Sequence, residues 1–202
     1  MPIIEHTATA LAAWGLFGYL LGSIPFGLVL ARIMGLGNLR QIGSGNIGAT
    51  NVLRTGNKTA AALTLLLDAG KGAVAVLIAR QFGSEDTAQI AGLIAMLGHC
   101  YPIWLKFAGG KGVATFLGIV LALSFPVGVG CCVAWLIGAL VSRISSMGAL
   151  VSAASSTVLL ILLGVPEAMM LSILLTLIVF WRHRSNIARI RAGTEPKIGQ
   201  KS

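Results

Sequence analysis

Two glycine-rich segments of the sequence carry the residue types that bind phosphate groups. The first reads RQIGSGNIGATNVLRTGNK and starts at Arg40. Glycine adopts backbone conformations that turn successive N–H groups toward one anion, and Arg54 and Lys58 follow as positive charges. Hydroxyl and amide side chains supply further hydrogen-bond donors. The candidate ligands in this segment are Ser44, Gly45, Asn46, Thr50, Asn51 and Arg54.

The second segment, GHCYPIWLKFAGGKGVATF, surrounds Lys111 with glycines directly before an apolar run. We therefore expect Lys111 at a helix N-terminus, where its ammonium group, backbone N–H groups and the helix dipole all favour a phosphate. A Walker A loop needs Ser or Thr directly after its Lys, and Gly112 occupies that position here. Lys111, with Gly110 and Gly112, thus predicts a phosphate site rather than a nucleotide site.

Two more polar segments follow later apolar runs. RISSMGA places Ser145 and Ser146 beside Arg143, where their hydroxyls could bind an anionic substrate or cap the next helix. The tail begins with WRHRSNIARIRAG, in which isoleucines lie among cations. This pattern predicts a short helix on the membrane surface that ends at Gly193.

Membrane-spanning helices must position these segments. The 202 residues are 56% hydrophobic and only 10% charged, whereas soluble proteins average about 25% charged residues. Apolar runs lie at residues 8–33, 59–80, 87–105, 112–124, 126–142, 147–164 and 167–181. The first run has no basic residue before it and is longer than the apolar region of a signal peptide, so we retain it as a span.

We therefore expect an all-α integral membrane protein with about seven transmembrane helices, each span taking about 20 residues. The count falls to six if the runs flanking Pro126 form one bent segment. Residues 1–202 would form a single polytopic membrane domain without a separate soluble part.

The basic residues predict the orientation of the helices. With the N-terminus outside and the C-terminus in the cytoplasm, most Lys and Arg residues fall on the cytoplasmic side, as the positive-inside rule requires. The cytoplasmic segments are then about 34–58, 98–115, 143–147 and the tail 182–202. Acidic residues such as Glu5 and Glu167 fall on the other side, with only Arg80 as a basic neighbour. All the candidate phosphate-binding segments thus share one predicted face.

Several other features have structural explanations. Asp68 and Lys71 are three residues apart inside a predicted span, so we expect them to pair on one helix face. The net charge of +9 does not indicate nucleic acid, because the basic residues lie between apolar runs with few aromatic neighbours. Close helix packing explains the glycines inside the runs, namely Gly15, Gly22, Gly118 and Gly138.

The motifs GSIPFG, GSGNIGATNVLRTG, DAGKG, GHCYPIWLKFAGGKGVAT and RHRSNIARIRAGTE occur in this order and extend over nearly the whole chain. Together they resemble the PlsY family, the bacterial glycerol-3-phosphate acyltransferases that use acyl phosphate as donor. The resemblance implies seven spans with an external N-terminus. It also implies three motif loops that meet at a cytoplasmic groove of the inner (plasma) membrane.

The resemblance further implies the reaction and its residues. The 1-hydroxyl of glycerol 3-phosphate attacks the carbonyl of acyl phosphate and gives lysophosphatidic acid and inorganic phosphate for phospholipid biosynthesis. We expect Lys111, Arg54 and His183 to be catalytic and the remaining candidates to bind substrate. The family's functional positions fall on Ser44, Arg54, Lys111, His183 and Asn186, with a weaker correspondence at Ser145 and Ser146.

The general base stays open at this stage. Histidine changes charge near neutral pH, so His183 could take the proton, but its basic neighbours also suit phosphate binding while a substrate phosphate oxygen takes the proton. The His-x4-Asp motif of thioester-dependent acyltransferases is absent, since Ala188 and Trp104 stand five residues after His183 and His99. The donor must therefore bring more of its own activation.

Three other classes of membrane protein fit less well. An anion transporter would show an internal repeat and polar residues at the midplane. A structural lipid-binding protein would leave the glycine-rich segments unexplained. A CDP-alcohol phosphotransferase would need a carboxylate cluster, and the cytoplasmic side offers only Asp68 and Glu195, so we expect neither a metal nor another cofactor. The expected partners are the two substrates and membrane lipid, not nucleic acid; oligomeric state and acyl-chain preference stay open.

Overall fold

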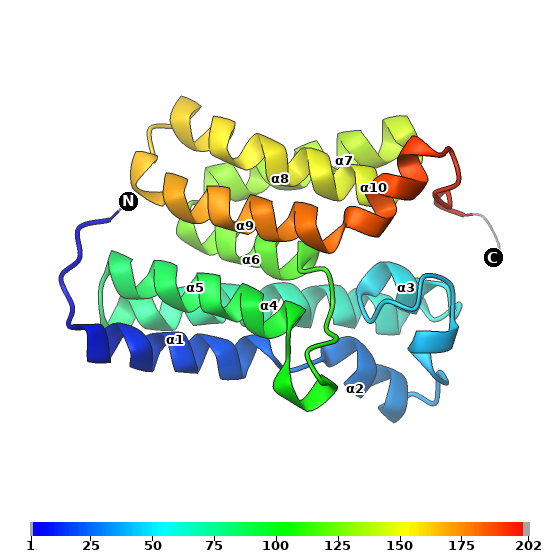
Figure 1. The fold of residues 1–202 in the computed structure, drawn as a ribbon, viewed down its shortest axis with the longest axis horizontal. Helices are drawn as coiled ribbons and strands as arrows, with labels where there is room; N and C mark the ends of the chain where they lie inside the picture. The colour runs from blue at the N-terminus through cyan, green and yellow to red at the C-terminus, as the bar shows by residue number, and fades with distance from the viewer. Residues whose placement is uncertain (1, 200–202) are drawn as a thin grey trace. The chain divides into compact units, whose positions relative to one another are not determined.

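The computed structural model describes residues 2–199, and every regular element within them is a helix (Figure 1). Short 3-10 turns lie at Leu39–Gln41, Ile103–Leu105 and Pro166–Ala168. The α-helices are α1 (Ala8–Gly22), α2 (Phe26–Ile33), α3 (Ala49–Leu53), α4 (Lys58–Phe82), α5 (Glu85–Cys100), α6 (Val113–Leu123), α7 (Phe125–Ser142), α8 (Ser145–Leu162), α9 (Met169–Arg182) and α10 (Arg184–Arg191).

Five helical stretches in the described residues are long and apolar enough to cross a membrane, or six if the bent pair α9 and α10 counts as one span. Helix α6 is apolar but has only 11 residues, fewer than the roughly 20 that a span needs. The prediction of an all-helical membrane protein is confirmed, whereas seven spans and the orientation of the termini stay predictions. The five stretches are Ala8–Ile33, Lys58–Phe82, Glu85–Leu105, Phe125–Ser142 and Ser145–Leu162.

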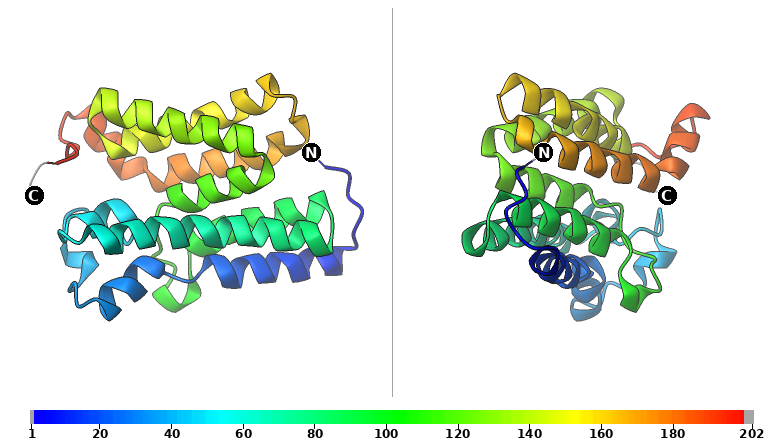
Figure 2. Two further views of the ribbon diagram at one scale, coloured as in Figure 1. Left: turned by 180° about the vertical axis from the view of Figure 1, so that it is seen from behind. Right: turned by 60° about the vertical axis from the view of Figure 1, so that its left-hand side comes forward.

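The helices form two compact units, with the boundary inside α6. We call residues 4–119 the N-terminal unit and the part from residue 120 onward the C-terminal unit. In the N-terminal unit α1, α4 and α5 run alongside one another (Figures 1 and 2). In the C-terminal unit α8 packs on both α7 and α9.

Small residues allow α1 to pack closely on α5. A Cβ atom on Gly18 would lie 2.3 Å from the carbonyl oxygen of Ala91, and one on Gly22 would lie 2.1 Å from that of Ala95. The spacing of four residues on both helices is the small-xxx-small pattern that brings membrane helices together. The packing role predicted for Gly22 is therefore confirmed.

The other packing glycines differ among themselves. A Cβ on Gly118 would lie 1.9 Å from the carbonyl oxygen of Ala69, so glycine is needed there, and one on Gly138 would lie a tight 3.1 Å from the Cα atom of Gly148. A Cβ on Gly15 would meet Ile94 at an ordinary 3.5 Å. The predicted packing role is thus confirmed for Gly118, the helices are also close at Gly138, and the packing at Gly15 does not require glycine.

The predicted pair of Asp68 and Lys71 is confirmed within α4, with 2.8 Å between Lys71 Nζ and Asp68 Oδ1. Lys71 Nζ also donates a hydrogen bond of 2.7 Å to the carbonyl oxygen of Ile24. Ile24 lies in the break between α1 and α2, where Pro25 lacks the N–H that would continue the helix. The Ile24 carbonyl oxygen also accepts the N–H of Phe26 at 3.1 Å, so Lys71 adds a second bond that ties α4 to the break.

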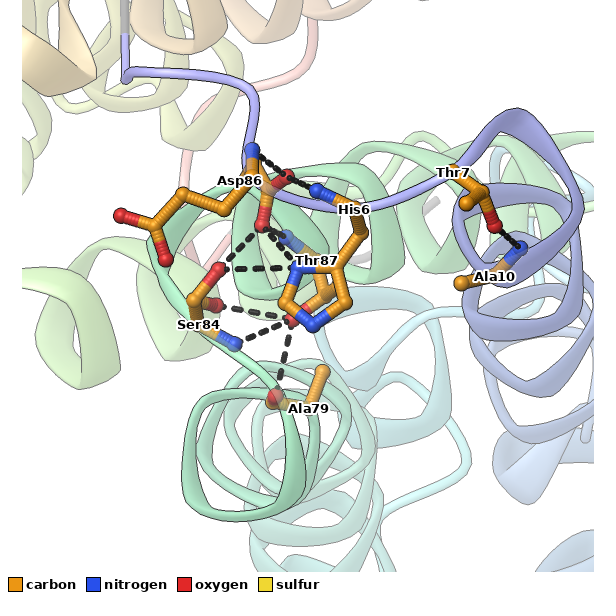
Figure 3. Close-up of polar contacts among 8 residues, drawn as sticks. His6, Thr7, Ala10, Ala79, Ser84, Asp86 and Thr87 are labelled. Carbon is orange, nitrogen blue, oxygen red and sulfur yellow. Dashed lines mark hydrogen bonds and ion pairs between the residues drawn. The ribbon is translucent and has the colours of Figure 1, made fainter.

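At the end of the N-terminal unit where α5 begins, Asp86 holds the segment that precedes α1 (Figure 3). Its Oδ2 accepts the backbone N–H groups of Glu5 and His6 at 2.9 and 3.1 Å, and its Oδ1 lies 3.0 Å from His6 Nδ1. Ser84 donates its hydroxyl to the same carboxylate. Asp86 is 3% exposed, so these donors offset the cost of burying its charge.

Hydroxyl groups join α8 to α9 in the C-terminal unit. Ser156 Oγ lies 2.7 Å from Ser172 Oγ, and Thr176 donates to the carbonyl oxygen of Ala153 at 2.8 Å. Such interhelical bonds contribute about 0.6 kcal/mol each in a membrane protein.

After Ser124 the chain turns back, since a Cβ on Gly128 would lie 2.5 Å from the Cα of Leu121. The runs flanking Pro126 are therefore two helices rather than one bent segment.

Candidate active site

The first glycine-rich loop is built around the side chain of Asn51, which is 2% exposed. Its Nδ2 donates to the carbonyl oxygens of Leu39 at 3.0 Å and Asn46 at 2.7 Å. Its Oδ1 accepts the backbone N–H of Ser44 at 3.1 Å and lies 3.4 Å from the Ser44 hydroxyl. Asn51, at the third position of α3, thus fixes the shape of the loop through these contacts.

Positive backbone φ angles favour glycine at two positions of this loop. Gly43 has φ of 51° and Gly45 has φ of 66°, which side-chain-bearing residues adopt at a cost. A Cβ on Gly43 would also lie 2.4 Å from Nη1 of Arg54. The guanidinium of Arg54 therefore lies against Gly43, next to Ser44. Ser44 and Thr50 are exposed, and Gly45 and Asn46 are half-buried.

The second glycine-rich loop folds back on the end of α5. The N–H groups of Gly109 and Gly110 donate to the carbonyl oxygens of Cys100 and His99, both at 3.1 Å. Gly112 has φ of 83°, and a Cβ there would lie 2.2 Å from Met96 Cε. Half-buried Lys111 stands two residues before Val113, the first residue of α6. The prediction that Lys111 stands at a helix N-terminus is thus confirmed to within two residues.

The backbone before Lys111 is strained. Lys106 and Phe107 have φ of 51° and 61°, a conformation that costs non-glycine residues about 1 kcal/mol or more each. Tyr19 holds this turn in place, because its hydroxyl donates to the carbonyl oxygen of Tyr101 at 2.9 Å and accepts the N–H of Ile103 at 3.0 Å. The Trp104 indole donates to Ser23 at 2.8 Å. Side chains therefore tie the loop to the end of α1.

Arg40 connects the two glycine-rich loops of the N-terminal unit. Its guanidinium donates to the carbonyl oxygen of Ala108 in the second loop and, at 3.4 Å, to that of Gly45 in the first. The loops that carry Arg54 and Lys111 therefore lie together. The contact between Arg40 and Ala108 spans 68 positions of the chain, so local sequence spacing does not predict it.

Three candidate residues of the C-terminal unit, Ser146, His183 and Asn186, lie around the bend between α9 and α10. The two helices meet at 61°, and His183 stands at the junction with 2% of its surface exposed. His183 Nδ1 lies 2.8 Å from the carbonyl oxygen of Val179, one helical turn earlier. Because a carbonyl oxygen only accepts, Nδ1 is the nitrogen that donates in this contact.

Glu195 connects two of the candidate residues, Ser146 and Asn186, a contact that the sequence alone did not predict. Its Oε1 accepts the Asn186 amide at 2.5 Å and the Ser146 hydroxyl at 2.6 Å, and its Oε2 pairs with Arg189 Nε at 2.7 Å. Its side chain is 7% exposed. Burial raises the pKa of Glu195, but the bonds from Ser146, Asn186 and Arg189 outweigh burial and hold the pKa below its ordinary value.

The predicted capping role of Ser145 and Ser146 is wrong. The N-cap of α8 is Ile144, and no side chain there accepts a capping hydrogen bond. Ser145 instead starts the helix, and the Ser146 hydroxyl is directed to Glu195. Ser146 is 8% exposed, so in this structure its hydroxyl supports the Glu195 network.

The predicted helix of the tail is confirmed as α10. It ends as expected at Gly193, whose φ is 70°. The N–H groups of Gly193 and Thr194 donate to the carbonyl oxygens of Ile190 and Arg189, the bond pattern of a Schellman motif. Its location on the membrane surface stays a prediction, and Lys201 of the predicted basic tail lies outside the described residues.

Comparison with known proteins assigns a family to this arrangement. Residues 12–193 match the family model described as glycerol-3-phosphate acyltransferase. A glycerol-3-phosphate acyltransferase of Roseobacter denitrificans is 75% identical over 199 residues, which are 98% of this chain and all of the relative. One of Ruegeria pomeroyi is 70% identical over 202 residues, with both chains fully covered.

Two crystal structures of PlsY (YgiH), described as an integral membrane glycerol 3-phosphate acyltransferase, have the same fold. The glycerol 3-phosphate form has a TM-score of 0.88, with 38% sequence identity over 94% of this chain and 96% of that one. The lysophosphatidic acid form has a TM-score of 0.87 at the same identity, over 94% and 95% of the two chains. This chain therefore belongs to the glycerol-3-phosphate acyltransferases, as a multi-pass membrane protein of the PlsY type.

Proposed function

We propose that the chain transfers a fatty acyl group from acyl phosphate to the 1-hydroxyl of glycerol 3-phosphate, giving lysophosphatidic acid and inorganic phosphate. The observation that carries the proposal is the link through Arg40, because it joins two loops whose glycines, Arg54 and Lys111 suit two phosphate groups. Related structures in glycerol 3-phosphate and lysophosphatidic acid forms agree with the proposed acceptor and product.

The chemistry needs little from the protein beyond charge and geometry. Acyl phosphate is a mixed anhydride: the acceptor oxygen forms a bond to the carbonyl carbon while the bond from that carbon to the bridging oxygen breaks. Phosphate leaves with the bridging oxygen, and the hydroxyl proton passes to a base. We propose that Lys111 and Arg54 stabilise the phosphates and that backbone N–H groups near Gly45, Gly110 and Gly112 orient them.

Other candidate residues receive supporting roles. Ser44, Asn46 and Thr50 would donate hydrogen bonds to a substrate. Asn51 would preserve the shape of their loop, since its amide already bonds to Leu39, Ser44 and Asn46. In the C-terminal unit Asn186 would act on substrate, with Ser145 and Ser146 as further polar contacts. The reaction as proposed needs no metal and no cofactor.

The hydroxyl proton has two candidate acceptors. His183 suits the role because histidine exchanges protons near neutral pH and because its Nδ1 contact with Val179 fixes the orientation of the ring. A phosphate oxygen of the substrate is the alternative. The variant His183→Gln separates the two, since loss of an essential general base lowers kcat by about a hundredfold or more. A decrease of only a few-fold would assign the proton to the substrate.

We further propose that the enzyme lies in the bacterial inner membrane with both glycine-rich loops facing the cytoplasm. The distribution of Lys and Arg supports this orientation. The exposed leucines, isoleucines and valines along α1, α4, α7 and α8 suit contact with lipid, and membrane lipid would thus surround the site.

Phosphate release tests the proposed reaction. Purified protein is mixed with acyl phosphate and glycerol 3-phosphate in the presence of a chelator, and release that requires both substrates supports an acyltransferase. Lys111→Ala should lower kcat/KM by about a hundredfold or more, since a charged donor to the leaving group is lost. Arg32→Ala, which removes an exposed cation from the last turn of α2, is the matched control. Equal rates for both variants would contradict the assignment of Lys111.

A further inference from the structure

The N-terminal unit buries three ionisable side chains that the proposed reaction does not use. Asp68, Lys71 and His99 are 2%, 3% and 5% exposed. Lys71 Nζ lies 2.8 Å from Asp68 Oδ1, and His99 Nδ1 lies 3.7 Å from the same atom, which is within ion-pair range but too long for a hydrogen bond. Burying charged groups in a membrane protein is costly, so their presence calls for a role.

The cluster joins separate parts of the unit. Lys71 donates to the carbonyl oxygen of Ile24 in the break between α1 and α2, at 2.7 Å. The hydroxyl of Thr115, in the first turn of α6, donates to the backbone carbonyl of Asp68 at 2.9 Å. His99 belongs to the last turn of α5. The two ends of the second glycine-rich loop, at His99 and Thr115, are therefore both held to the same turn of α4.

His99 also lies directly beneath that loop. Its carbonyl oxygen accepts the N–H of Gly110 at 3.1 Å. A Cβ atom on Gly110 would lie 2.1 Å from His99 Nε2, and one on Gly109 would lie 2.2 Å from the His99 carbonyl oxygen. Gly110 thus packs on the ring of His99 and Gly109 on its backbone, with no room for a side chain at either position. A shift of the ring must move Gly110, the residue before Lys111.

We propose that Asp68 and His99 are positioning residues that set the place of the second glycine-rich loop, with Lys71 as their counter-charge. The Asp68 carboxylate attracts the imidazole across 3.7 Å, the imidazole packs against Gly110, and Gly110 directly precedes Lys111. The proposal rests on the proposed function in one respect, since it takes Lys111 to be the cation that binds a phosphate. The buried charges then determine the geometry of the second glycine-rich loop rather than the strength of helix packing.

The test compares variants that separate charge balance from positioning. Asp68→Asn with Lys71→Met removes both charges together, so that no lone buried charge remains. His99→Leu removes the polar contact with Asp68, and His99→Gln keeps a side-chain N–H donor as the conservative variant. Asp86→Asn is the matched control, because Asp86 is equally buried in the same unit but binds the segment before α1 (Figure 3).

Two readouts apply to full-length protein in detergent. Hydrogen exchange at residues 106–112 reports on the bonds of Gly109 and Gly110 without any substrate. Steady-state kinetics give KM for each substrate and kcat. We expect the double variant and His99→Leu to exchange about tenfold faster in this segment, with KM for a phosphate-bearing substrate raised about tenfold, as misplacement of a binding group predicts. His99→Gln should restore most of both, and Asp86→Asn should change only the melting temperature.

Three outcomes would overturn the proposal. The first is unchanged exchange and KM in the double variant and His99→Leu. The second is faster exchange with unchanged kinetics. The third is failure of both variants to accumulate while Asp86→Asn accumulates, because the cluster would then be a requirement for folding. If the wild-type chain transfers no acyl group, the proposed function fails, whereas the exchange comparison still decides whether the cluster holds the loop.

Discussion

Replacing Glu195 by Gln exchanges one carboxylate oxygen for an amide NH₂ group. It also removes the negative charge that accepts hydrogen bonds from Ser146, Asn186 and Arg189. The Gln carbonyl oxygen can still accept from Ser146 and Asn186 in place of Oε1. The Gln amide group, however, would face Arg189 Nε, a donor, where Oε2 now accepts at 2.7 Å. The substitution therefore weakens two hydrogen bonds and removes a third.

The expected cost follows from these contacts. Hydrogen bonds to a charged group contribute about 1 kcal/mol more than neutral ones, so the bonds from Ser146 and Asn186 together lose about 2 kcal/mol. The Arg189 side chain is 39% exposed and can turn to water, so its pair adds less than about 1 kcal/mol. We expect a total loss of about 2 kcal/mol and, for a chain of this size, a fall in Tm of about 4–8 °C.

Thermal unfolding in detergent and steady-state kinetics measure the two consequences. Because Glu195 holds the Asn186 amide, Glu195→Gln should also lower kcat/KM by about tenfold at a temperature where the variant is folded. Glu167→Gln, which alters an exposed glutamate of the same unit, should change neither quantity. A Glu195→Gln variant that matches the wild type in Tm and kcat/KM would refute the reasoning about this network.

Three more predictions concern stability and loop shape. The pKa of Glu195 lies below its ordinary value of 4.5, so its contribution to stability should be complete above a pH of about 4.5. This contribution should be lost as the pH falls through the lowered pKa. When Tm is measured as a function of pH, Glu195→Gln should lack this part of the acid transition. Gly22→Leu should lower Tm strongly, since even a Cβ would lie 2.1 Å from the Ala95 carbonyl oxygen, whereas Gly70→Leu meets no atom within 4 Å of its Cβ and should be tolerated. Asn51→Leu should lower kcat/KM by about tenfold or more, because the carbonyl oxygens of Leu39 and Asn46 lose their donor and the first loop loses its shape; wild-type kinetics would contradict this role.

Features that depend on local spacing could be predicted from the sequence. Asp68 and Lys71 pair because residues three apart share a helix face. Gly193 ends α10 because glycine adopts the positive φ that follows a helix. The positions of both glycine-rich loops also follow from local composition, since apolar runs leave few other places for polar residues.

Contacts between distant segments could not be predicted in the same way. Arg40 meets Ala108 across 68 positions, and Ser146 meets Glu195 across 49, and no periodicity relates such pairs. In the sequence Glu195 is an isolated carboxylate, and its type and position alone do not indicate which side chains it binds. The break before α2 did have a signal in Pro25, but the apolar run at residues 8–33 continues through it, and hydrophobicity alone does not reveal the break.

Isotope labelling of the donor tests the central claim most directly. Acyl phosphate is prepared with ¹⁸O in the oxygen that bridges carbon and phosphorus, and the products with glycerol 3-phosphate are analysed by mass spectrometry. Acyl transfer breaks the bond from the carbonyl carbon to this oxygen, so the label should appear in inorganic phosphate, and the new ester should carry the unlabelled acceptor oxygen. Label retained in a free fatty acid, or phosphate transferred to glycerol 3-phosphate, would contradict the account.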